Sequence, residues 1–378
     1  MLDASRQSEI KADIGFFALA DMGYIAYNIG QHDLQFGIAH LTSLSQQNNL
    51  PLLSANLHRG TSPVFQPYIM HTVDSPEGII NSPEGIIKIA IIGLISPNHA
   101  IYAQNLDLKI VDPKDVLKPI MSKLIMDADV IVCLFNGTSA EATTLKSNFP
   151  MLDVVVISNE KTDNITQSPH PHTLVNTGVK GKAVYAVKII RDTTGKLIVK
   201  KPIRYLLHER IHDSPRMTQL LELYQEMIVA EDLVESPPQK QQKTTPQFVG
   251  TTTCKTCHIG EWKSWKETKH AHAYHTLEVA GHETDPECLT CHTVGFGASS
   301  GFISVEKTPH HIDVGCENCH GPGSNHAEHP EQKGYGKIKE TLCVTCHTLE
   351  NSPKFDIKVY FPQIVHSDKE SPIKETSH

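Results

Sequence analysis

Four copies of one five-residue pattern, Cys-x-x-Cys-His, lie in the last third of this 378-residue chain. They are Cys254-Lys-Thr-Cys257-His258, Cys288-Leu-Thr-Cys291-His292, Cys316-Glu-Asn-Cys319-His320 and Cys343-Val-Thr-Cys346-His347. The four copies use eight of the nine cysteines, and fourteen of the 23 histidines lie beyond residue 250. The thiols and imidazoles of the chain are therefore concentrated in this segment, and continuous apolar runs become scarce there.

The pattern is the sequence by which a c-type haem is attached to a protein. The two thiols form thioethers with the haem, and the adjoining His becomes the proximal iron ligand. Zinc knuckles also use Cys-x-x-Cys, but zinc gives no reason for His to follow every copy. At 23 His in 378 residues, four such His by chance have a probability on the order of 10⁻⁵. A redox dithiol would need a βαβ context, which is missing here. We therefore expect four covalently attached haem c groups, one for each motif.

The sixth coordination position of each iron decides what such a segment does. A second His closes the iron and favours electron transfer, whereas an open position lets a small molecule bind. Ten histidines outside the motifs could supply second ligands: His270, His272, His275, His282, His310, His311, His326, His329, His366 and His378. At most four of them can do so, and spacing alone does not choose among them.

Composition excludes some partners. The net charge of −8 and the lack of a basic patch interleaved with aromatic residues argue against nucleic acid. Haem propionates would add negative charge, so we expect a basic or otherwise complementary redox partner protein. The chain has no apolar run of about 18 residues, so we expect no membrane span. Haem c is attached outside the cytoplasm, which indicates a periplasmic or extracellular location, although residues 1–6 lack the features of a signal peptide.

The first half of the chain alternates strand-like and helix-like segments, which predicts an α/β domain. We expect strands at 24–29, 51–56, 86–96, 129–135, 153–157, 173–178, 182–191 and 196–201, and helices at 37–47, 113–126 and 217–233. Residues 236–247 have the Pro, Gln, Lys and Thr composition of a linker. This divides the chain into domains at 1–235 and 248–378. In the second domain we expect one long helix at 261–280 and otherwise short helices and loops around the haems.

The first domain resembles the periplasmic 5′-nucleotidase branch of the calcineurin-like metallophosphatases over roughly residues 1–230. The resemblance lies in Met22-Gly-Tyr-Ile-Ala-Tyr-Asn-Ile-Gly-Gln-His-Asp-Leu-Gln-Phe-Gly37, Leu52-Leu-Ser-Ala-Asn56, Ile91-Ile-Gly-Leu94 and Val175-Asn-Thr-Gly-Val-Lys-Gly181. It implies an α/β metallophosphatase-like sandwich in which two metal ions activate a water for phosphoester hydrolysis.

The metal-binding positions of that family are altered here. The family's Gly-Asn-His-Asp/Glu loop is Gly30-Gln31-His32-Asp33, and Ser5-Arg6, Asn136 and Ser158-Asn159-Glu160-Lys161 replace its other ligand positions. Only His32 remains recognisable, so we expect a catalytically inactive scaffold or docking domain. By the same comparison the first strand would lie upstream of Met1, which would leave the sandwich incomplete with an exposed sheet edge. Cys133 lies in an apolar strand, where we expect a buried small side chain.

The second domain resembles the tetrahaem cytochrome c-554 family over about residues 248–366. The resemblance lies in Phe248-Val-Gly-x₃-Cys254-x-x-Cys257-His258, Trp265-x₄-His270-Ala271, Val314-Gly-Cys316-Glu-x-Cys319-His320-Gly-Pro-Gly-x-x-His326 and Ile364-Val-His366. It implies three irons with two His ligands each and a second haem that is often five-coordinate. By position, His326 would be the distal ligand of the first haem, His270 of the third and His366 of the fourth.

The haem on His292 would then have an open face, which His272, His275, His282 or the pair His310-His311 could close. We expect those histidines to be surface or propionate-binding residues instead. Glu317 and the Gly321-Pro-Gly323 turn would shape a haem pocket rather than transfer protons.

Three functions follow from these observations. The first is an extracytoplasmic multihaem cytochrome c that transfers electrons through four haems and carries a pseudo-phosphatase domain. The alternative is a haem enzyme acting on a small nitrogen or sulfur species at the His292 haem, which needs an open iron. A second alternative is a metal-dependent 5′-nucleotidase or phosphoesterase fused to a cytochrome, which needs metal ligands that this sequence lacks.

Overall fold

A computed structural model of the chain describes residues 6–74, 86–99, 107–158, 173–178, 181–191, 197–208, 210–234, 246–348 and 351–366. The chain divides into two compact units, Met1–Leu220 and Leu221–His378, and the division falls within helix α5 (Pro215–Ala230). Ser5, residues 159–161, His378 and residues 236–245 of the expected linker lie outside the described residues.

The first unit is built on a five-stranded sheet with the strand order β10-β9-β8-β6-β5. These strands are β10 (Leu174–Asn176), β9 (Val154–Ser158), β8 (Val130–Asn136), β6 (Ile86–Ile95) and β5 (Tyr68–Asp74). The first four run parallel to their neighbours, and β5 is an antiparallel edge strand. Strands β6 and β8 are continuous apolar runs because both of their faces are covered, as is usual in parallel sheets.

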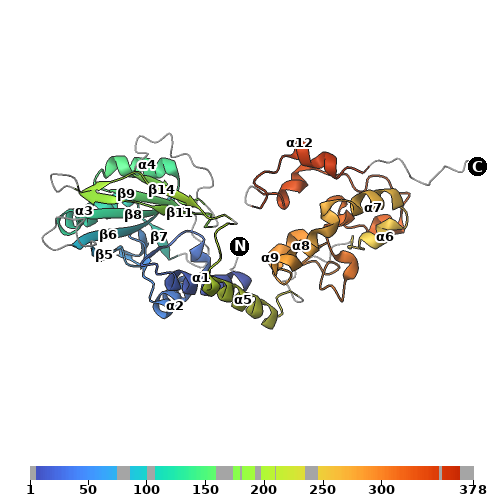
Figure 1. Cartoon of the computed structure of the whole chain (residues 1–378), viewed down its shortest axis with the longest axis horizontal. Helices are drawn as coiled ribbons and strands as arrows, with labels where there is room; N and C mark the ends of the chain where they lie inside the picture. The colour runs from blue at the N-terminus through green and yellow to red at the C-terminus, as the bar shows by residue number, and fades with distance from the viewer. Residues whose placement is uncertain are drawn as a thin grey trace, which may run out of the picture. The chain divides into compact units, whose positions relative to one another are not determined.

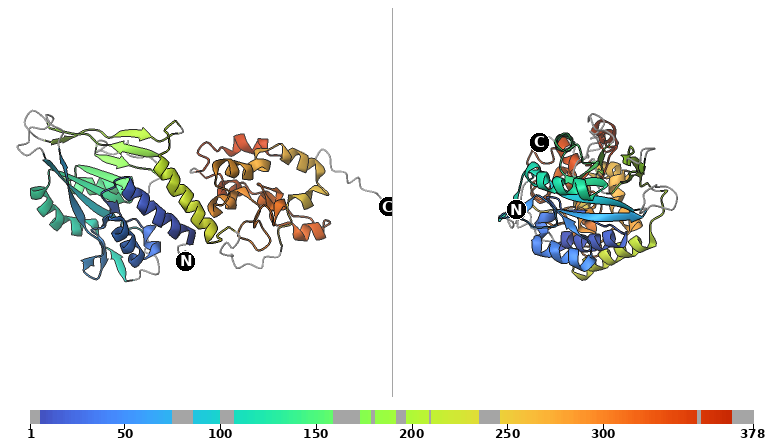
Figure 2. Two further views of the ribbon diagram at one scale, coloured as in Figure 1. Left: turned by 60° about the horizontal axis from the view of Figure 1, so that its bottom comes forward. Right: turned by 90° about the vertical axis from the view of Figure 1, so that its left-hand side faces the viewer.

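Alternate residues of β6 face two different apolar clusters, since successive side chains of a strand point to opposite faces. Ala90, Ile92 and Leu94 pack in one cluster with helices α3 (Pro113–Asp127) and α4 (Ser139–Asn148). Ile95 packs in the other with helices α1 (Arg6–Asp21) and α2 (Ile38–Asn48). Accordingly, α4 lies on one side of the strands and α1 and α2 on the other (Figure 1 and Figure 2).

Side-chain hydrogen bonds cap the N-termini of helices α3 and α4, which follow strands β7 and β8 in the sequence. The Asp112 carboxylate accepts a hydrogen bond from Lys114 N at 2.8 Å, and Pro113 occupies the first turn of α3. Thr138 and Glu141 form a reciprocal capping box at the start of α4. These caps fix where the two helices begin.

Shorter strands complete the unit. They are β1 (Tyr27–Asn28), β2 (Leu52–Leu53), β3 (Leu57–Arg59), β4 (Ser62–Pro63), β7 (Leu108–Ile110), β11 (Ala183–Ala186), β12 (Ile189–Arg191), β13 (Leu197–Val199) and β14 (Ile203–Leu206). Strands β1 and β2 pair in parallel, and β11 with β14 and β12 with β13 form antiparallel ribbons. The expected strands at 24–29 and 51–56 are thus present but shortened.

The α/β class predicted for this part is confirmed by the structure, and so are the helices expected at 37–47, 113–126 and 217–233. The sequence analysis did not predict helices α1 and α4 or strands β3, β4, β5, β7 and β14, and the strand expected at 182–191 is divided into β11 and β12. Helix α4 has few apolar residues, but its Thr138-x-x-Glu141 capping box was a readable signal.

The second unit is made of short helices joined by loops (orange to red in Figure 1). They are α6 (Thr251–Lys255), α7 (Ile259–Lys266), η4 (Lys269–His272), α8 (Ala273–Ala280), α9 (Pro286–His292), η5 (Pro309–His311), α10 (Cys316–His320), α11 (Ser324–Glu328), η6 (Glu340–Thr345), α12 (Ile357–Tyr360) and η7 (Phe361–Gln363). In its described part, one small cluster of buried apolar side chains is found: Tyr274, Leu277, Leu289 and Phe302.

The single helix expected at 261–280 is wrong, because the chain breaks it into α7, η4 and α8. The break is held by long-range hydrogen bonds. Trp265 Nε1 donates to Val314 O at 2.9 Å, and Val314 N donates to His270 O at 3.1 Å. Helical periodicity across 261–280 cannot reveal such contacts, and the break is what sets the direction of the His270 ring.

Gly93 in β6 provides a test of the packing between the sheet and β1–β2. A Cβ at Gly93 would lie 2.5 Å from Asn28 Oδ1 and 2.6 Å from Leu53 Cβ. We predict that Gly93→Ala lowers the free energy of unfolding by about 1–3 kcal/mol, because the strands must move apart. The measurement is urea unfolding of the full chain followed by far-UV circular dichroism.

The matched control is Gly15→Ala in α1, where the added Cβ meets no atom within 4 Å. Ala in place of Gly inside a helix should stabilise by roughly 0.5–1 kcal/mol. A Gly93→Ala variant as stable as the wild type would contradict the packing described here.

Candidate multihaem site

The four motifs share one local geometry. Each Cys-x-x-Cys lies on or at the end of a short helical turn, in α6, α9, α10 and η6. His258 N donates to Cys254 O at 3.0 Å, and His347 N donates to Cys343 O at 2.9 Å. Residues three apart on such a turn lie on one face, so both thiols of a motif point to the same side. This arrangement suits attachment of one planar group to both thiols.

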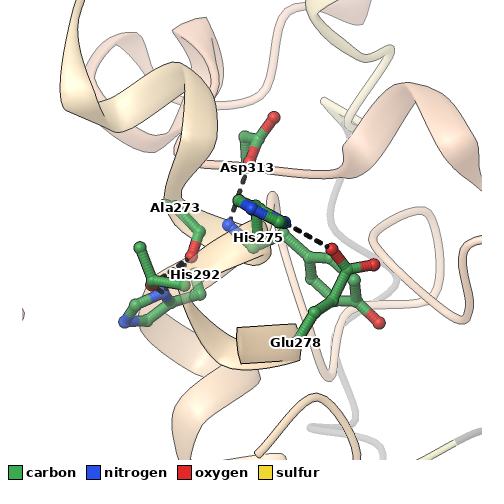
Figure 3. A network of polar contacts seen from close by, with 7 residues as sticks. Ala273, His275, Glu278, His292 and Asp313 are labelled. Carbon is green, nitrogen blue, oxygen red and sulfur yellow. Dashed lines mark hydrogen bonds and ion pairs between the residues drawn. The ribbon is translucent and has the colours of Figure 1, made fainter. Parts of the chain in front are cut away.

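Three of the four motif histidines are oriented by a hydrogen bond to ring atom Nδ1. The partners are Ala273 O for His292 at 2.7 Å, Gly336 O for His320 at 2.7 Å and Ser352 Oγ for His347 at 2.9 Å. Figure 3 shows the His292 ring directed at the Ala273 carbonyl. A ring held by Nδ1 to a carbonyl presents Nε2 as the free nitrogen, which is the usual arrangement for a metal-binding His.

Three motif histidines each face a second imidazole. The ring centroids are 6.1 Å apart for His258 and His326, 5.8 Å for His320 and His366, and 6.1 Å for His347 and His270. An imidazole nitrogen binds a metal at about 2 Å, so a metal between two facing imidazoles holds their centroids about 6 Å apart. The spacing of all three pairs therefore fits an iron bound by two histidines.

The pairing differs from the expected one at two motifs. His326 lies beside the first motif as expected, but His270 lies beside His347 rather than His320, and His366 beside His320 rather than His347. The reason is the path of the chain: the break after α7 carries His270 to the fourth motif, and η7 brings the following segment back to the third. Order along the sequence does not contain this information.

The third motif lines a hollow with a volume of about 150 Å³. Its walls include Cys316, Cys319, His320 and His366, together with Cys254 and His258 of the first motif and His270. The apolar part of the wall consists of Trp262, Trp265, Val314, Ile338, Phe361, Ile364 and Val365. Thiols, an imidazole pair and flat apolar walls in one hollow are the groups that a haem needs.

Thiols from different motifs also meet. The thiol of Cys254 in the first motif lies close enough to Cys316 of the third to affect its pKa, and Cys291 of the second motif lies likewise close to Cys346 of the fourth. Cys319 of the third motif lies within electrostatic reach of Cys343 and Cys346. The attachment points of the four motifs thus adjoin in the order first, third, fourth, second.

His292 differs from the other motif histidines. Within the described ranges, no imidazole ring faces it as in the other three pairs. Among the histidines expected near it, His275 is exposed and its Nδ1 bonds Glu278 at 3.0 Å (Figure 3). His311 is only 3% exposed, and burial together with neighbouring His310 lowers the pKa of His311 to about 4.

The altered phosphatase positions of the first unit hydrogen-bond one another. Asn136 Oδ1 accepts from Gln31 N at 3.3 Å, and Asn136 Nδ2 donates to Ser158 Oγ at 3.1 Å. The Asp33 carboxylate accepts from Gly30 N at 2.7 Å and from Tyr27 Oη at 3.1 Å, and burial raises the pKa of Asp33. These contacts brace the loop.

Two other residues singled out from the sequence have ordinary surroundings. His32 is exposed, and Arg6 pairs with Glu9 at 2.9 Å. Cys133 is buried in the core, where desolvation raises the pKa of its thiol. Within the described part of the chain, no three His, Cys, Asp or Glu side chains are arranged to hold a single metal ion.

Comparison with known proteins bears on the second unit. Residues 253–321, which include the first three motifs, match the family described as "Cytochrome c554 and c-prime". The chain is 34% identical over 93 residues to "Cytochrome c-554" of Nitrosomonas europaea, covering 21% of this chain and 40% of that protein. It therefore spans less than half the length of this relative.

Some solved structures that are similar to this chain are phosphoesterases. One is the calcineurin-like phosphoesterase YfkN from Bacillus subtilis, with a TM-score of 0.49 and 15% identity over 59% of this chain and 77% of that chain. Another is a 5′-nucleotidase precursor from Thermus thermophilus, with a TM-score of 0.47 and 16% identity over 68% of this chain and 54% of that chain. Residues 253–321 of this chain thus resemble the family of cytochrome c-554.

Proposed function

We propose that this protein is an extracytoplasmic multihaem cytochrome that binds four haem c groups and passes electrons between them. The observation that carries the proposal is the spacing of the three imidazole pairs, 5.8–6.1 Å between centroids, each formed by one motif His and one distant His. Chance packing of imidazoles gives no reason for one spacing to recur at three motifs.

In this proposal each side chain has one role. The thiols that form thioethers are Cys254, Cys257, Cys288, Cys291, Cys316, Cys319, Cys343 and Cys346. The proximal ligands are His258, His292, His320 and His347, and the distal ligands are His326 for the first haem, His366 for the third and His270 for the fourth. Bound haem supplies one-electron oxidation and reduction of its iron, and two imidazoles keep the coordination unchanged between the two states.

The adjoining attachment points support an electron path. The contacts Cys254–Cys316 and Cys291–Cys346, with Cys319 near Cys343, order the haems as first, third, fourth, second. The chain contributes by holding the imidazoles: Ala273 O, Gly336 O and Ser352 Oγ orient three proximal rings and raise their basicity. The last haem in this order, on His292, differs from the other three because no second imidazole lies opposite His292 among the described residues.

The location and partner belong to the proposal as well. Haem c is attached outside the cytoplasm, which supports a periplasmic or extracellular protein. Among the helices of the described residues, none has the length and apolar character needed to cross a membrane. The net charge of −8, made more negative by propionates, suits a redox partner protein with a complementary basic surface.

The first unit would serve as a scaffold or docking domain rather than as a hydrolase. The side chain of Asn136, at one of the family's ligand positions, is engaged with Gln31 N and Ser158 Oγ. Arg6, a cation, stands at another. A dinuclear metal centre needs a set of His and carboxylate ligands, which these residues do not supply.

A second candidate function is favoured by His292 alone. An iron on His292 without a second imidazole would bind a small nitrogen or sulfur species, and the other three haems would exchange electrons with it. The same four-haem assembly serves both functions, so the two differ only in the coordination of this iron.

We predict that the purified protein carries four covalent haems, measured by the pyridine haemochrome assay and by intact mass. Cys288→Ala with Cys291→Ala should remove one haem, because both thioethers of the second motif are lost. Cys133→Ala, a core cysteine outside the motifs, should leave the count at four. Fewer than four haems in the wild type would refute the proposal.

The exchanged pairing of His270 and His366 has its own test. In ferric protein, His366→Ala should convert one low-spin haem to high-spin in the electron paramagnetic resonance spectrum, whereas exposed His329→Ala should not. In a Cys316→Ala/Cys319→Ala background, which lacks the third haem, adding His366→Ala should have no further effect. A new high-spin signal in that background would assign His366 to the fourth haem instead.

The coordination of the second haem is tested with carbon monoxide. We predict that the reduced wild type binds about one carbon monoxide per chain, since one iron in four lacks a second His ligand. Loss of the second haem in the Cys288→Ala/Cys291→Ala variant should abolish this binding. Wild type that binds none would leave electron transfer as the sole function supported here.

A further inference from the structure

Glu317, inside the third motif, is a buried carboxylate surrounded by backbone N–H groups. Its side chain is 3% exposed. Oε1 accepts from Val249 N at 2.9 Å and from Gly323 N at 2.7 Å, and Oε2 accepts from Gly250 N at 2.7 Å and from Val249 N at 3.1 Å. Within the described residues, no Lys, Arg or His forms an ion pair with it.

Backbone N–H groups surround both oxygens of Glu317. A backbone N–H can only donate, and each oxygen receives such donors. These peptide dipoles, rather than a neighbouring cation, stabilise the carboxylate.

The carboxylate joins the first and third motifs. Val249 and Gly250 immediately precede α6, which carries Cys254, and Gly323 ends the turn that follows His320. A Cβ at Gly323 would lie 3.2 Å from Glu317 Oε1, so glycine permits the close approach of this turn. Thr251 Oγ1 adds a hydrogen bond from Cys316 N at 3.4 Å.

The charge also acts on its surroundings. Burial, and after it the negative charge of Glu317, raises the pKa of Tyr335, whose ring stacks on His326 with centroids 4.7 Å apart. His326 faces His258 of the first motif. Glu317, in the third motif, therefore lies near a tyrosine that packs on a candidate ligand of the first motif.

We propose that Glu317 is a potential-setting residue: its fixed buried charge lowers the reduction potentials of the haems on His258 and His320. Reduction adds one electron to the iron and removes one unit of positive charge, so a nearby anion favours the oxidised state. The effect is strong because a water-poor interior screens the charge weakly. The inference rests on the proposed four-haem function.

The test is a potentiometric redox titration of holoprotein carrying Glu317→Gln, which removes the charge and nearly keeps the shape. Two of the four midpoint potentials should move to higher values. Glu306→Gln is the matched control, because it removes the same charge from an exposed position of this unit and should leave all four unchanged. A covalent haem count on each protein separates failure of the proposed function from failure of this inference.

A residue that only braces the fold would give a different result. Glu317→Gln with four haems, a lower unfolding temperature and unchanged potentials would overturn the inference. If the Glu317→Gln variant does not retain its haems, a second measurement tests the inference on the wild type. Wild type labelled with ¹³C at the glutamate carboxyl groups is compared in its reduced and oxidised states by infrared difference spectroscopy. A glutamate carboxylate band that shifts on reduction supports the proposal; no glutamate band, or one from a protonated carboxyl, refutes it.

Discussion

The second unit depends on the distance between facing imidazole rings. Three pairs, drawn from residues that are 46 to 77 positions apart in the sequence, recur at 5.8–6.1 Å between centroids. Each pair draws together two segments that share little apolar surface of their own. A metal bound at about 2 Å by each ring would hold such a pair far more firmly than dispersion contacts between short helices. The unit is consistent with a fold whose core is completed by its cofactor.

The two units solve the problem of burial in different ways. In the first, β6 sends alternate side chains into two aliphatic clusters, and helices cover both. In the second, the described apolar cluster contains four buried side chains, and the remaining order comes from hydrogen bonds such as those of Glu317 and Trp265. A buried carboxylate is costly unless its oxygens are satisfied, and here three backbone N–H groups satisfy them. In the proposal above, the negative charge of Glu317 also lowers the reduction potentials of the haems on His258 and His320.

Local signals in the sequence predicted much of the first unit. The apolar runs of β6, β8 and β9 and the periodicity of α3 were sufficient to locate these elements. The reason is that burial of a strand or of one helix face leaves a regular apolar pattern in the sequence. Helix α4 was missed because it is polar, although its capping box marked the start. In the second unit, the expected helix at 261–280 was wrong because contacts with Val314, far along the chain, interrupt it.

The sequence by itself predicted which residues attach haem, because the two thiols and the His of Cys-x-x-Cys-His lie within one short stretch of chain. It also shows that the loop around Gln31 and His32 differs from the phosphatase pattern that it resembles, because the type of each side chain can be read directly from the sequence. Only the tertiary structure decided which distant imidazole meets which motif, exchanging His270 and His366 relative to the order expected from the sequence. The physical reason is that the path of the chain in space decides which distant His lies beside each motif. Helix breaks, turns and long-range hydrogen bonds determine that path.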